Sequence, residues 1–333
     1  MSFNAGDILE AYTIESCLSE IGGMAKIYLA YETERPTRQV ALKVQITGKK
    51  ESLMYQDLLR EEAALLKTLR HPSIVRIVPM RIDGRKTNFV ARAANQPDMP
   101  WYYAMEYLGG STLTNYISNF PDAMRVKLSN KPSKETMVNP GIYTIDWTIE
   151  LFYQILIAVE FMHHNGIAHG DLKPDNIIFR QSPTANKLPQ PVLIDFGSAS
   201  LFDRMRQLTS SMGYSPPEVM AAVKKGVGLN EAQDIDAEKI DIWALGVILF
   251  EILAGRKMRP TKGMGILSNT LISTRDKKIS RYRPDLHESV DKLLQVMLSD
   301  DPRDRPEVSQ IITAIEEKIF TIRPPRINSR RLY

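Results

Sequence analysis

Short apolar runs separated by turn-forming residues fill the first hundred positions, which is the pattern of β-strands. Three runs, "AYTIESCLS", "AKIYLAYE" and "QVALKVQI", are rich in β-branched and aromatic residues. Two further runs, "HPSIVRIV" and "WYYAMEYL", predict two more strands. The polar, irregular segment between them, residues 82–100, is expected to be a long hairpin loop. The pattern therefore predicts a β-rich N-terminal half.

One helix is expected within this half. Between Ser52 and Leu69, leucines recur every three or four positions, which places them on one face of a helix. Glu62 lies within that apolar face. A face that only packs against a core would carry no acid there. Glu62 is thus a candidate for a role beyond packing.

Beyond residue 110 the pattern becomes helical. Apolar residues at helical spacing cover positions 151–162, and Asn165-Gly166 marks the end of that helix. Further helices are expected around residues 241–254, 288–298 and 306–319. Two turn-rich segments, residues 118–146 and 221–239, are expected to be surface insertions.

The change of pattern divides the chain into two parts of an α+β protein. A small β-rich part is expected over residues 1–105 and a larger, mainly helical part over residues 106–333. A short connector is expected near Glu106 to Gly110. A cleft between two such parts is the expected ligand site.

Composition adds little that is unusual. The chain has 333 residues, 43% apolar and 25% charged, as in ordinary globular proteins. A net charge of +4 gives no reason to expect a nucleic-acid partner. The longest apolar stretch, "IDIWALGVILFEILAG", is interrupted by Asp241 and Glu251 and is short for a span of about 20 residues. It predicts a core helix and no membrane span.

The single cysteine, Cys17, excludes an intrachain disulfide and fits a reducing compartment. No signal peptide is expected, because "MSFNAGDILEAY" lacks a basic start and an apolar core. We therefore expect a cytoplasmic protein. Cys17 is expected to pack within the sheet rather than to react. The sequence does not indicate an oligomeric state.

The densest group of chemical side chains lies in "AHGDLKPDNIIF", residues 168–179, where a polar loop runs directly into an apolar strand. Asp171 and Asn176 are five positions apart on that loop, and Asp195 ends the later apolar run "VLID". If the flanking strands pair, Asn176 and Asp195 come together. Carboxylate and amide oxygens suit Mg²⁺, which is usually shared with substrate phosphates. Asp171 would then orient a hydroxyl and accept its proton.

Two lysines complete this candidate chemistry. Lys173 could neutralise charge on a transferred phosphoryl group. Lys43 ends the strand "VALK", where an unpaired buried ammonium would be costly, and Glu62 is its natural partner. The alternative for this pair is a surface ion pair of little energetic value. The turn in "IGGMAKIY" could let backbone approach a phosphate.

This ordered set resembles the eukaryotic-type, or Hanks-type, serine/threonine protein kinase family, from about Tyr12 to Ile319. The resemblance implies a bilobal protein-kinase-like fold, with a small β-rich lobe carrying one main helix and a larger helical lobe. It implies transfer of the γ-phosphoryl group from Mg-ATP to Ser or Thr hydroxyls of a protein substrate. ATP and Mg²⁺ are then the expected cofactors.

The resemblance also assigns the nucleotide site. "VALK" is similar to the strand whose lysine holds the α- and β-phosphates, and "AMEYL" is similar to the gatekeeper and the hinge, with Met105 as gatekeeper. Ile27 is expected above the adenine and Ile178 below it. The residues expected around the nucleotide are Gly22, Gly23, Ile27, Ala41, Lys43, Glu62, Met105, Glu106, Leu108 and Ile178.

The catalytic loop follows from the same resemblance. "HGDLKPDN" is similar to the loop that supplies a catalytic base, here Asp171, and a lysine on the γ-phosphate, here Lys173. Asn176 and Asp195 are the expected metal ligands. The Lys-Pro after Asp171 resembles serine/threonine rather than tyrosine kinases.

Structural roles are implied as well. "SPPE" resembles the family's A-P-E, so Glu218 should pair with Arg305, and "DIWALG" places Asp241 beneath the catalytic loop as an anchor. His169 is expected to brace the loop. His163 and His164 are expected to end a helix without a special task.

Two departures from the family pattern stand out. The Gly-rich loop is Glu20-Ile21-Gly22-Gly23-Met24-Ala25, so only the middle glycine of G-x-G-x-x-G is kept. Gly170 replaces the arginine that usually clasps a phosphorylated activation loop. We therefore expect activity without activation-loop phosphorylation. Replacing Thr209 or Ser210 with alanine, one at a time, should then leave phosphoryl transfer in place. Replacing Ser211 with alanine is a less clean test of the same expectation.

Two alternatives stay open at this stage. A pseudokinase-like scaffold or nucleotide-binding module is supported only by the degraded Gly-rich loop and opposed by the intact set of Lys43, Glu62, Asp171, Asn176 and Asp195. A small-molecule kinase of related fold ranks lower, because "SPPE" and "DIWALG" resemble a platform for protein substrates.

Overall fold

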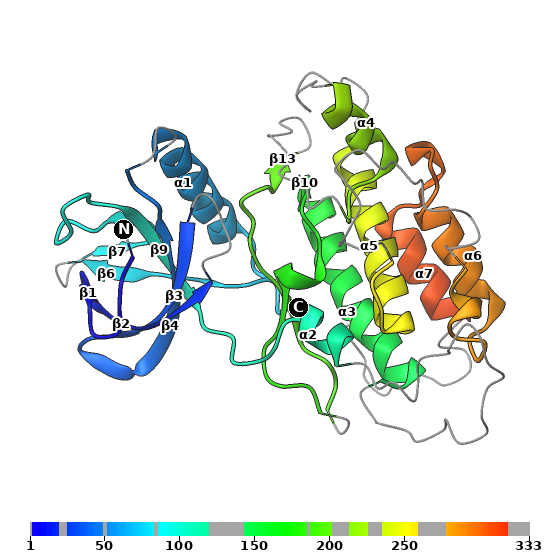
Figure 1. The fold of residues 1–333 in the computed structure, drawn as a ribbon, viewed down its shortest axis with the longest axis horizontal. Helices are drawn as coiled ribbons and strands as arrows, with labels where there is room; N and C mark the ends of the chain where they lie inside the picture. The colour runs from blue at the N-terminus through cyan, green and yellow to red at the C-terminus, as the bar shows by residue number, and fades with distance from the viewer. Residues whose placement is uncertain are drawn as a thin grey trace. The chain divides into compact units, whose positions relative to one another are not determined.

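The computed structural model describes residues 2–19, 25–48, 52–82, 86–119, 143–184, 187–201, 213–225, 235–258 and 278–318. The chain divides into two compact units (Figure 1). The first unit comprises Met1–Gly109 and Ile194–Gly197, and the second comprises Gly110–Leu193 and Ser198–Tyr333. The order of elements, a strand-rich first unit and a helix-rich second unit, confirms the expected α+β class.

The first unit is built on an antiparallel sheet in the order β1-β2-β3-β4-β9-β5, with β8 pairing to β9. Its strands are β1 (Ile8–Leu9), β2 (Tyr12–Ser19), β3 (Ala25–Glu32), β4 (Arg35–Gln45), β5 (Ile77–Val78), β8 (Ala91–Arg92) and β9 (Trp101–Glu106). The register places Lys43 of β4 opposite Ile27 of β3 and Tyr103 of β9. Lys43 therefore lies in the middle of the sheet.

Helix α1 (Ser52–Thr68) packs against β4, β5 and β9. Leu59, Ala63 and Leu66 are buried on its inner face, as the leucine spacing predicts. Glu62 shares that face and is only 4% exposed. A carboxylate in such a position needs partners, because burying an unpaired charge is costly.

One expectation for this unit was wrong, and another was confirmed only in part. Residues 82–100 do not form one long loop, because β6 (Met80–Ile82) pairs with β7 (Lys86–Asn88) and β8 follows. In "HPSIVRIV" only β5 is a strand, since the N–H groups of Ser73 and Ile74 bond back to His71 in a tight turn.

Cys17 also contradicts its expectation, because it is exposed rather than packed. The pairing of β2 with β3 shifts register between Ile14 and Ser16 and again between Cys17 and Ser19. These irregularities interrupt the strict in-and-out alternation of side chains on which the expectation depended.

The second unit is mainly helical. Its helices are α2 (Leu113–Ser118), α3 (Ile145–His164), α4 (Pro217–Lys225), α5 (Ala237–Ala254), α6 (Glu288–Met297) and α7 (Val308–Lys318). Two short antiparallel pairs accompany them, β10 (Ile167–Ala168) with β13 (Ser200–Leu201) and β11 (Ile177–Phe179) with β12 (Pro191–Leu193). The predicted insertions fall partly outside the described residues, at 120–142 and 226–234.

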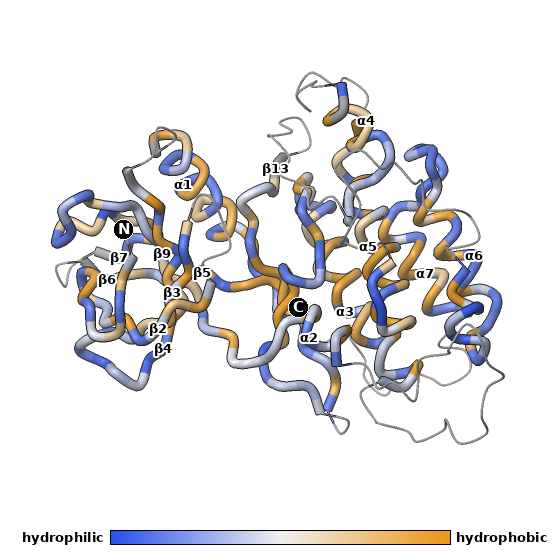
Figure 2. The backbone as a smooth tube through the Cα atoms, viewed as in Figure 1, coloured by the Kyte–Doolittle hydropathy of each residue, from blue (hydrophilic) through white to orange (hydrophobic). Residues whose placement is uncertain are grey.

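Helix α5 forms the centre of this unit. Its side chains from Ile240 to Ala254 are buried all round, and its residues are predominantly hydrophobic (Figure 2). This is the signature of a helix enclosed by others, and α3 and α6 both pack against it. The helix begins earlier than predicted, because Asp236 caps it by accepting from the N–H groups of Glu238 and Lys239. Within the described ranges, no helix combines the length and apolarity needed to cross a bilayer.

Candidate active site

A buried network of charges surrounds Lys43 in the first unit. Lys43 Nζ lies 2.7 Å from Glu62 Oε1 and 2.7 Å from Asp195 Oδ1. The side chains of Lys43 and Glu62 are only 12% and 3% exposed. The predicted pair is therefore present, and it is a buried ion pair rather than a surface one.

Glu62 joins three parts of this unit. Besides Lys43 of β4, its Oε1 accepts a hydrogen bond from the N–H of Phe196 at 2.9 Å. Tyr103 of β9 contributes a side-chain hydrogen bond to the same carboxylate. Neither Tyr103 nor the Phe196 N–H was predicted. The tyrosine left a faint signal, a hydroxyl within the apolar run "WYYAMEYL".

Burial and charge oppose each other in this network. Burial alone would lower the pKa of Lys43, but the carboxylates of Asp195 and Glu62 outweigh it and hold that pKa well above its ordinary value. Burial raises the pKa of Glu62, an effect that Lys43 opposes. Burial, with the nearby Glu62 charge, also holds the pKa of Tyr103 well above its ordinary value. Lys43 therefore stays cationic and Tyr103 stays a donor.

Asp195 has an unusual backbone conformation. Its φ is 62°, in the left-handed region that few residues other than glycine adopt. Such strain is found mainly at functional sites. Its side chain is 40% exposed, although Oδ1 already accepts from Lys43. A Cβ at Gly197 would lie 3.4 Å from that oxygen, so the glycine leaves room beside the carboxylate.

Except for Ile178, which lies on β11 of the second unit opposite Val192, the other described residues predicted around the nucleotide lie on or near the same sheet. Ala41 of β4 and Met105 of β9 are cross-strand partners and are both buried. The N–H of Glu106 donates to the carbonyl of Arg76 at 2.9 Å, so the sheet uses that donor. Leu108 is buried. Gly22 and Gly23 lie outside the described residues, as do Thr209, Ser210 and Ser211.

A second cluster of polar groups forms the loop between β10 and β11 in the second unit. Asp171 Oδ2 accepts from Lys173 Nζ at 2.6 Å and from Asn176 Nδ2 at 3.2 Å. Asn176 Nδ2 also donates to the carbonyl of Asp171 at 2.9 Å. Both partners of that nitrogen are oxygens, which fixes the orientation of the amide. The amide oxygen of Asn176 is therefore the atom that could bind a cation.

The loop is anchored on Asp241 of α5, which is 0% exposed. Its two carboxylate oxygens accept from the N–H groups of His169 and Gly170, at 2.8 and 2.9 Å. This is the anchor that the family resemblance implied. Gly170 has a φ of 76°, which glycine adopts without strain.

His163 corrects another expectation. It was expected to have no special task, but its Nε2 lies 3.0 Å from Asp241 Oδ2 and its side chain is only 8% exposed. It therefore braces the anchor of the loop. His169, which is 0% exposed, has the bracing position expected of it, and its Nδ1 accepts from the N–H of Asp171 at 3.4 Å.

A third predicted contact also lies in the second unit. Arg305 binds Glu218 with both terminal nitrogens, at 2.6 and 2.8 Å. Its Nε and Nη1 donate to the carbonyls of Ser299 and Lys239. Bidentate pairing with these extra bonds satisfies a guanidinium that is only 2% exposed. The contact fixes the start of α4 against the segment that precedes α7.

The predicted metal ligands are both oxygen donors, an amide in the second unit and a carboxylate in the first. Such donors suit a hard cation such as Mg²⁺, which keeps several waters and binds few protein groups. Within the part of the chain that the structure describes, no three His, Cys, Asp or Glu side chains form a metal-binding group. A dedicated all-protein metal cage is therefore not found among these residues.

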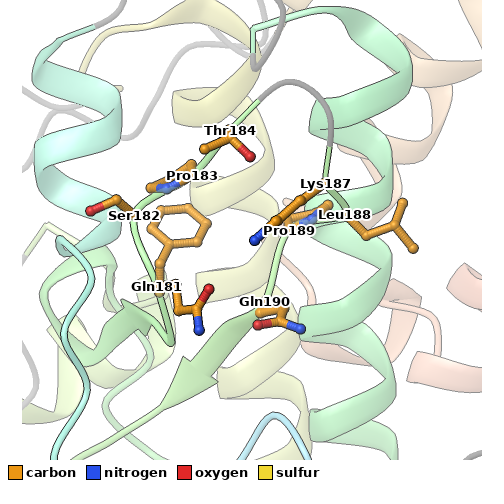
Figure 3. Close-up of a pocket in the computed structure, with 9 residues that line it drawn as sticks. Gln181, Ser182, Pro183, Thr184, Lys187, Leu188, Pro189 and Gln190 are labelled. Carbon is orange, nitrogen blue, oxygen red and sulfur yellow. The ribbon is translucent and has the colours of Figure 1, made fainter.

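A cavity in the second unit lies away from these residues. It has a volume of about 450 Å³ and is lined by the loop that joins β11 to β12 (Figure 3). Trp147 of α3 fixes this loop by donating from Nε1 to the carbonyl of Lys187 at 3.1 Å. Of the predicted site residues, none lines this cavity.

Comparison with known proteins identifies the class. The protein kinase domain model matches residues 20–314, so the chain belongs to the protein kinase family. It is similar to CBL-interacting protein kinase 25 of Oryza sativa subsp. japonica, with 27% identity over 298 residues, 87% of this chain and 48% of that protein.

Two other relatives come from distant organisms. Calcium/calmodulin-dependent protein kinase type 1 of Macrobrachium nipponense is 28% identical over 236 residues, 70% of this chain and 54% of that protein. Serine/threonine-protein kinase PrkC of Bacillus subtilis (strain 168) is 27% identical over 319 residues, 93% of this chain and 40% of that protein. The chain thus spans about half the length, or less, of these relatives.

Proposed function

We propose that this chain is a serine/threonine protein kinase that transfers the γ-phosphoryl group of ATP to hydroxyls of protein substrates. The observation that carries the proposal is the loop carboxylate Asp171, bonded to Lys173 and Asn176 above the buried anchor Asp241. Membership of the protein kinase family supports it. The relative PrkC, named a serine/threonine-protein kinase, supports the choice of acceptor.

Asp171 would orient the acceptor hydroxyl and take its proton as the oxygen attacks phosphorus. Phosphoryl transfer needs little covalent chemistry from the protein, so catalysis is mainly positioning and charge stabilisation. Lys173, whose Nζ is 2.6 Å from Asp171 Oδ2, would neutralise charge on the transferred group while its other protons remain available.

Lys43 would hold the α- and β-phosphates of ATP. Glu62 fixes the direction of the Lys43 side chain, and the raised pKa of Lys43 keeps it charged at neutral pH. Ile27, Ala41, Met105, Glu106, Leu108 and Ile178 are proposed to surround the adenine, with Gly22 and Gly23 on the phosphates.

Mg²⁺ would be held by the amide oxygen of Asn176 and the carboxylate of Asp195. When bound, it would offset the charge of the phosphates and fix their orientation.

We also infer a cytoplasmic, reducing location, which the free thiol of Cys17 supports. The division of the chain at residues 105 and 106 is likewise a proposal.

The scaffold alternative depended on the Gly-rich loop, which lies outside the described residues. Among the described residues, no contact favours it over the enzyme. A binding assay without an activity assay would not separate the two, because both would bind nucleotide.

The deciding experiment measures transfer and binding together. The purified chain is incubated with labelled ATP, Mg²⁺ and matched peptides that carry Ser, Thr or Tyr at one position. We expect label on Ser and Thr peptides, no label with EDTA, and a rise in melting temperature with Mg-ATP. Nucleotide binding without transfer to any peptide would favour the scaffold, and label confined to the Tyr peptide would contradict the proposed acceptor.

A further inference from the structure

Residues 2–10, which we call the strap, pack against the sheet of the first unit. Phe3 is 8% exposed and belongs to a buried apolar cluster that also contains Tyr28 of β3 and Leu42 of β4. Its ring meets the Tyr28 ring edge to face, with the centroids 5.5 Å apart. Leu9 joins the same cluster from the other end of the strap. The strap is therefore part of a core rather than a solvated segment.

Hydrogen bonds join the start of the strap to β3. The N–H of Phe3 donates to the hydroxyl of Tyr28 at 3.3 Å. Lys26 Nζ donates to Ser2 Oγ at 2.8 Å. The strap thus contacts two residues of β3, one on each side of Ile27.

The end of the strap is fixed by the segment that precedes β9. The N–H of Glu10 donates to Asn95 Oδ1 at 3.2 Å, and the N–H of Asn95 donates to Glu10 Oε1 at 2.9 Å. The side-chain amides of Asn95 and Gln96 both donate to the carbonyl of Ile8, at 3.0 and 2.8 Å. Glu10 has a φ of 51°, a conformation that few residues other than glycine adopt. These bonds therefore hold a strained turn in place.

The strap lies on the face of the sheet opposite the predicted nucleotide. The register pairs Ile27 with Lys43 and Tyr28 with Leu42. Successive side chains of a strand point to opposite faces of a sheet. Because Tyr28 and Leu42 share the cluster with Phe3, Ile27 points to the other face, together with Lys43. A shift of β3 on the strap side would therefore move Ile27 on the nucleotide side.

Strand β3 has an irregular neighbour at this point. The pairing of β2 with β3 shifts register between Cys17 and Ser19, and Ser19 is the partner of Ile27. A register shift of this kind disrupts the hydrogen-bond ladder locally. The contacts from Ser2 and Phe3 support β3 where its ladder with β2 is interrupted.

We propose that Phe3 is a positioning residue for the nucleotide, because it fixes β3 from one face and thereby fixes Ile27 on the other. The inference rests on the proposed function, which places the adenine of ATP against Ile27. Phe3 acts through β3 and does not touch the nucleotide. It also lies outside residues 20–314, which the protein kinase domain model matches, so the family pattern assigns it no role.

The test replaces Phe3 with alanine and measures transfer to a peptide at varied ATP, at a temperature where every variant is folded. We expect KM for ATP to rise about tenfold with kcat nearly unchanged, because a displaced strand weakens the ground state and the transition state alike. A displacement of about 1 Å can cost about a hundredfold, so the expected effect is moderate. Phe3→Leu refills the apolar site and should restore most of the affinity.

Met80→Ala is the matched control. Met80 is 1% exposed in the same cluster, but it lies on β6, which pairs with β7. Truncating either side chain leaves a cavity in the same core, so both variants should lose stability to a similar degree. Only Phe3→Ala should raise KM for ATP. An equal rise in both variants, or a rise in neither, would overturn the proposal and leave Phe3 with a packing role alone.

A binding arm separates this inference from the proposed function. Calorimetric titration with Mg-ATP reports the affinity of each variant without any transfer. Weaker binding in Phe3→Ala, restored in Phe3→Leu, would support the positioning role even if no peptide is phosphorylated, and only the proposed function would then fail. Transfer by the wild type, with equal affinity for Mg-ATP in the wild type and in Phe3→Ala, would overturn the positioning role and leave the kinase in place.

Discussion

The two charged clusters of this molecule are held in different ways. The cluster in the first unit joins residues far apart in sequence, since Lys43 bonds to Glu62 and to Asp195, 152 positions away. The cluster in the second unit is local, since Asp171, Lys173 and Asn176 lie within five positions of one another. One is assembled by tertiary folding, and the other is a loop shaped by its own side chains.

Their support differs as well. The first cluster is supported by charge, because a buried ammonium and a buried carboxylate each need the other. The second is supported through its backbone, because two consecutive N–H groups are fixed on the buried carboxylate of Asp241. We therefore expect substitutions in the first cluster to reduce stability and activity together. In the second cluster, activity and stability should be separable.

The largest effect on activity is expected for Asp171→Asn. The amide keeps the size of the side chain and one acceptor oxygen, but it cannot take a proton from the acceptor hydroxyl. Loss of a general base lowers the rate by about a hundred- to ten-thousandfold. The melting temperature should stay close to that of the wild type.

The matched control is Asp175→Asn, in the same loop but exposed, with a single bond from Thr114. It should keep most of the transfer activity. Equal loss in the two variants would mean that the charge of the loop matters more than one proton acceptor. Full activity in Asp171→Asn would remove Asp171 from the mechanism.

The largest effect on stability is expected for Glu62→Gln. The substitution leaves Lys43 buried with one carboxylate fewer and weakens the bonds from Tyr103 and Phe196. Breaking a buried ion pair costs about 3 kcal/mol or more. Denaturant unfolding should show this loss together with a raised KM for ATP.

Glu61→Gln changes the neighbouring, exposed residue on the same helix and serves as the control. Its unfolding free energy should differ little from that of the wild type. If Glu62→Gln lost activity but no stability, the two clusters would behave alike, and charge would not be what supports the first one.

Asp241→Asn tests the backbone support of the second cluster. An amide can accept from one N–H group but presents its own N–H₂ to the other, so His169 or Gly170 loses its acceptor. An unsatisfied buried group costs about 1–3 kcal/mol. Amide hydrogen exchange at residues 169 and 170 should quicken and transfer should fall, whereas exchange in the first unit should not change. Unchanged exchange at both amides would show that the loop keeps its shape without this anchor.

Local contacts explain why much of the candidate site could be predicted from the sequence. Asp171, Lys173 and Asn176 carry their pattern within one short motif, so the loop was found from the residues alone. The pairing of Lys43 with Glu62 was inferred from an acid on an apolar helix face, since both positions violate simple packing rules. The anchoring role of Asp241 came through the family resemblance, because nothing in the local pattern of α5 indicates its partners.

The missed contacts depend on tertiary placement. The bond from the Phe196 N–H to Glu62 is a backbone contact across 134 positions, which leaves no trace in side-chain spacing. The contact of His163 with Asp241 requires the packing of α3 against α5. Cys17 was misplaced because register shifts in the pairing of β2 with β3 override the alternation of a regular strand.

The smallest predicted effect is a pH dependence located in the first unit. Burial lowers the pKa of His71 from its ordinary value of 6.5 to about 4, and its Nδ1 accepts from the N–H of Ser73 at 3.1 Å. Between these two pH values the unfolded chain binds more protons than the folded one, so stability falls as the pH drops from about 6.5 to about 4. His71→Asn keeps an acceptor for Ser73 but does not titrate, so the free energies of unfolding at pH 7 and pH 4.5 should differ less than in the wild type.

The control is His287, which accepts from the N–H of Ser289 in the same way at an exposed helix end, so His287→Asn should leave that difference in place. An equal loss of unfolding free energy between pH 7 and pH 4.5 in the wild type and in His71→Asn would mean that other groups govern the acid response of this unit.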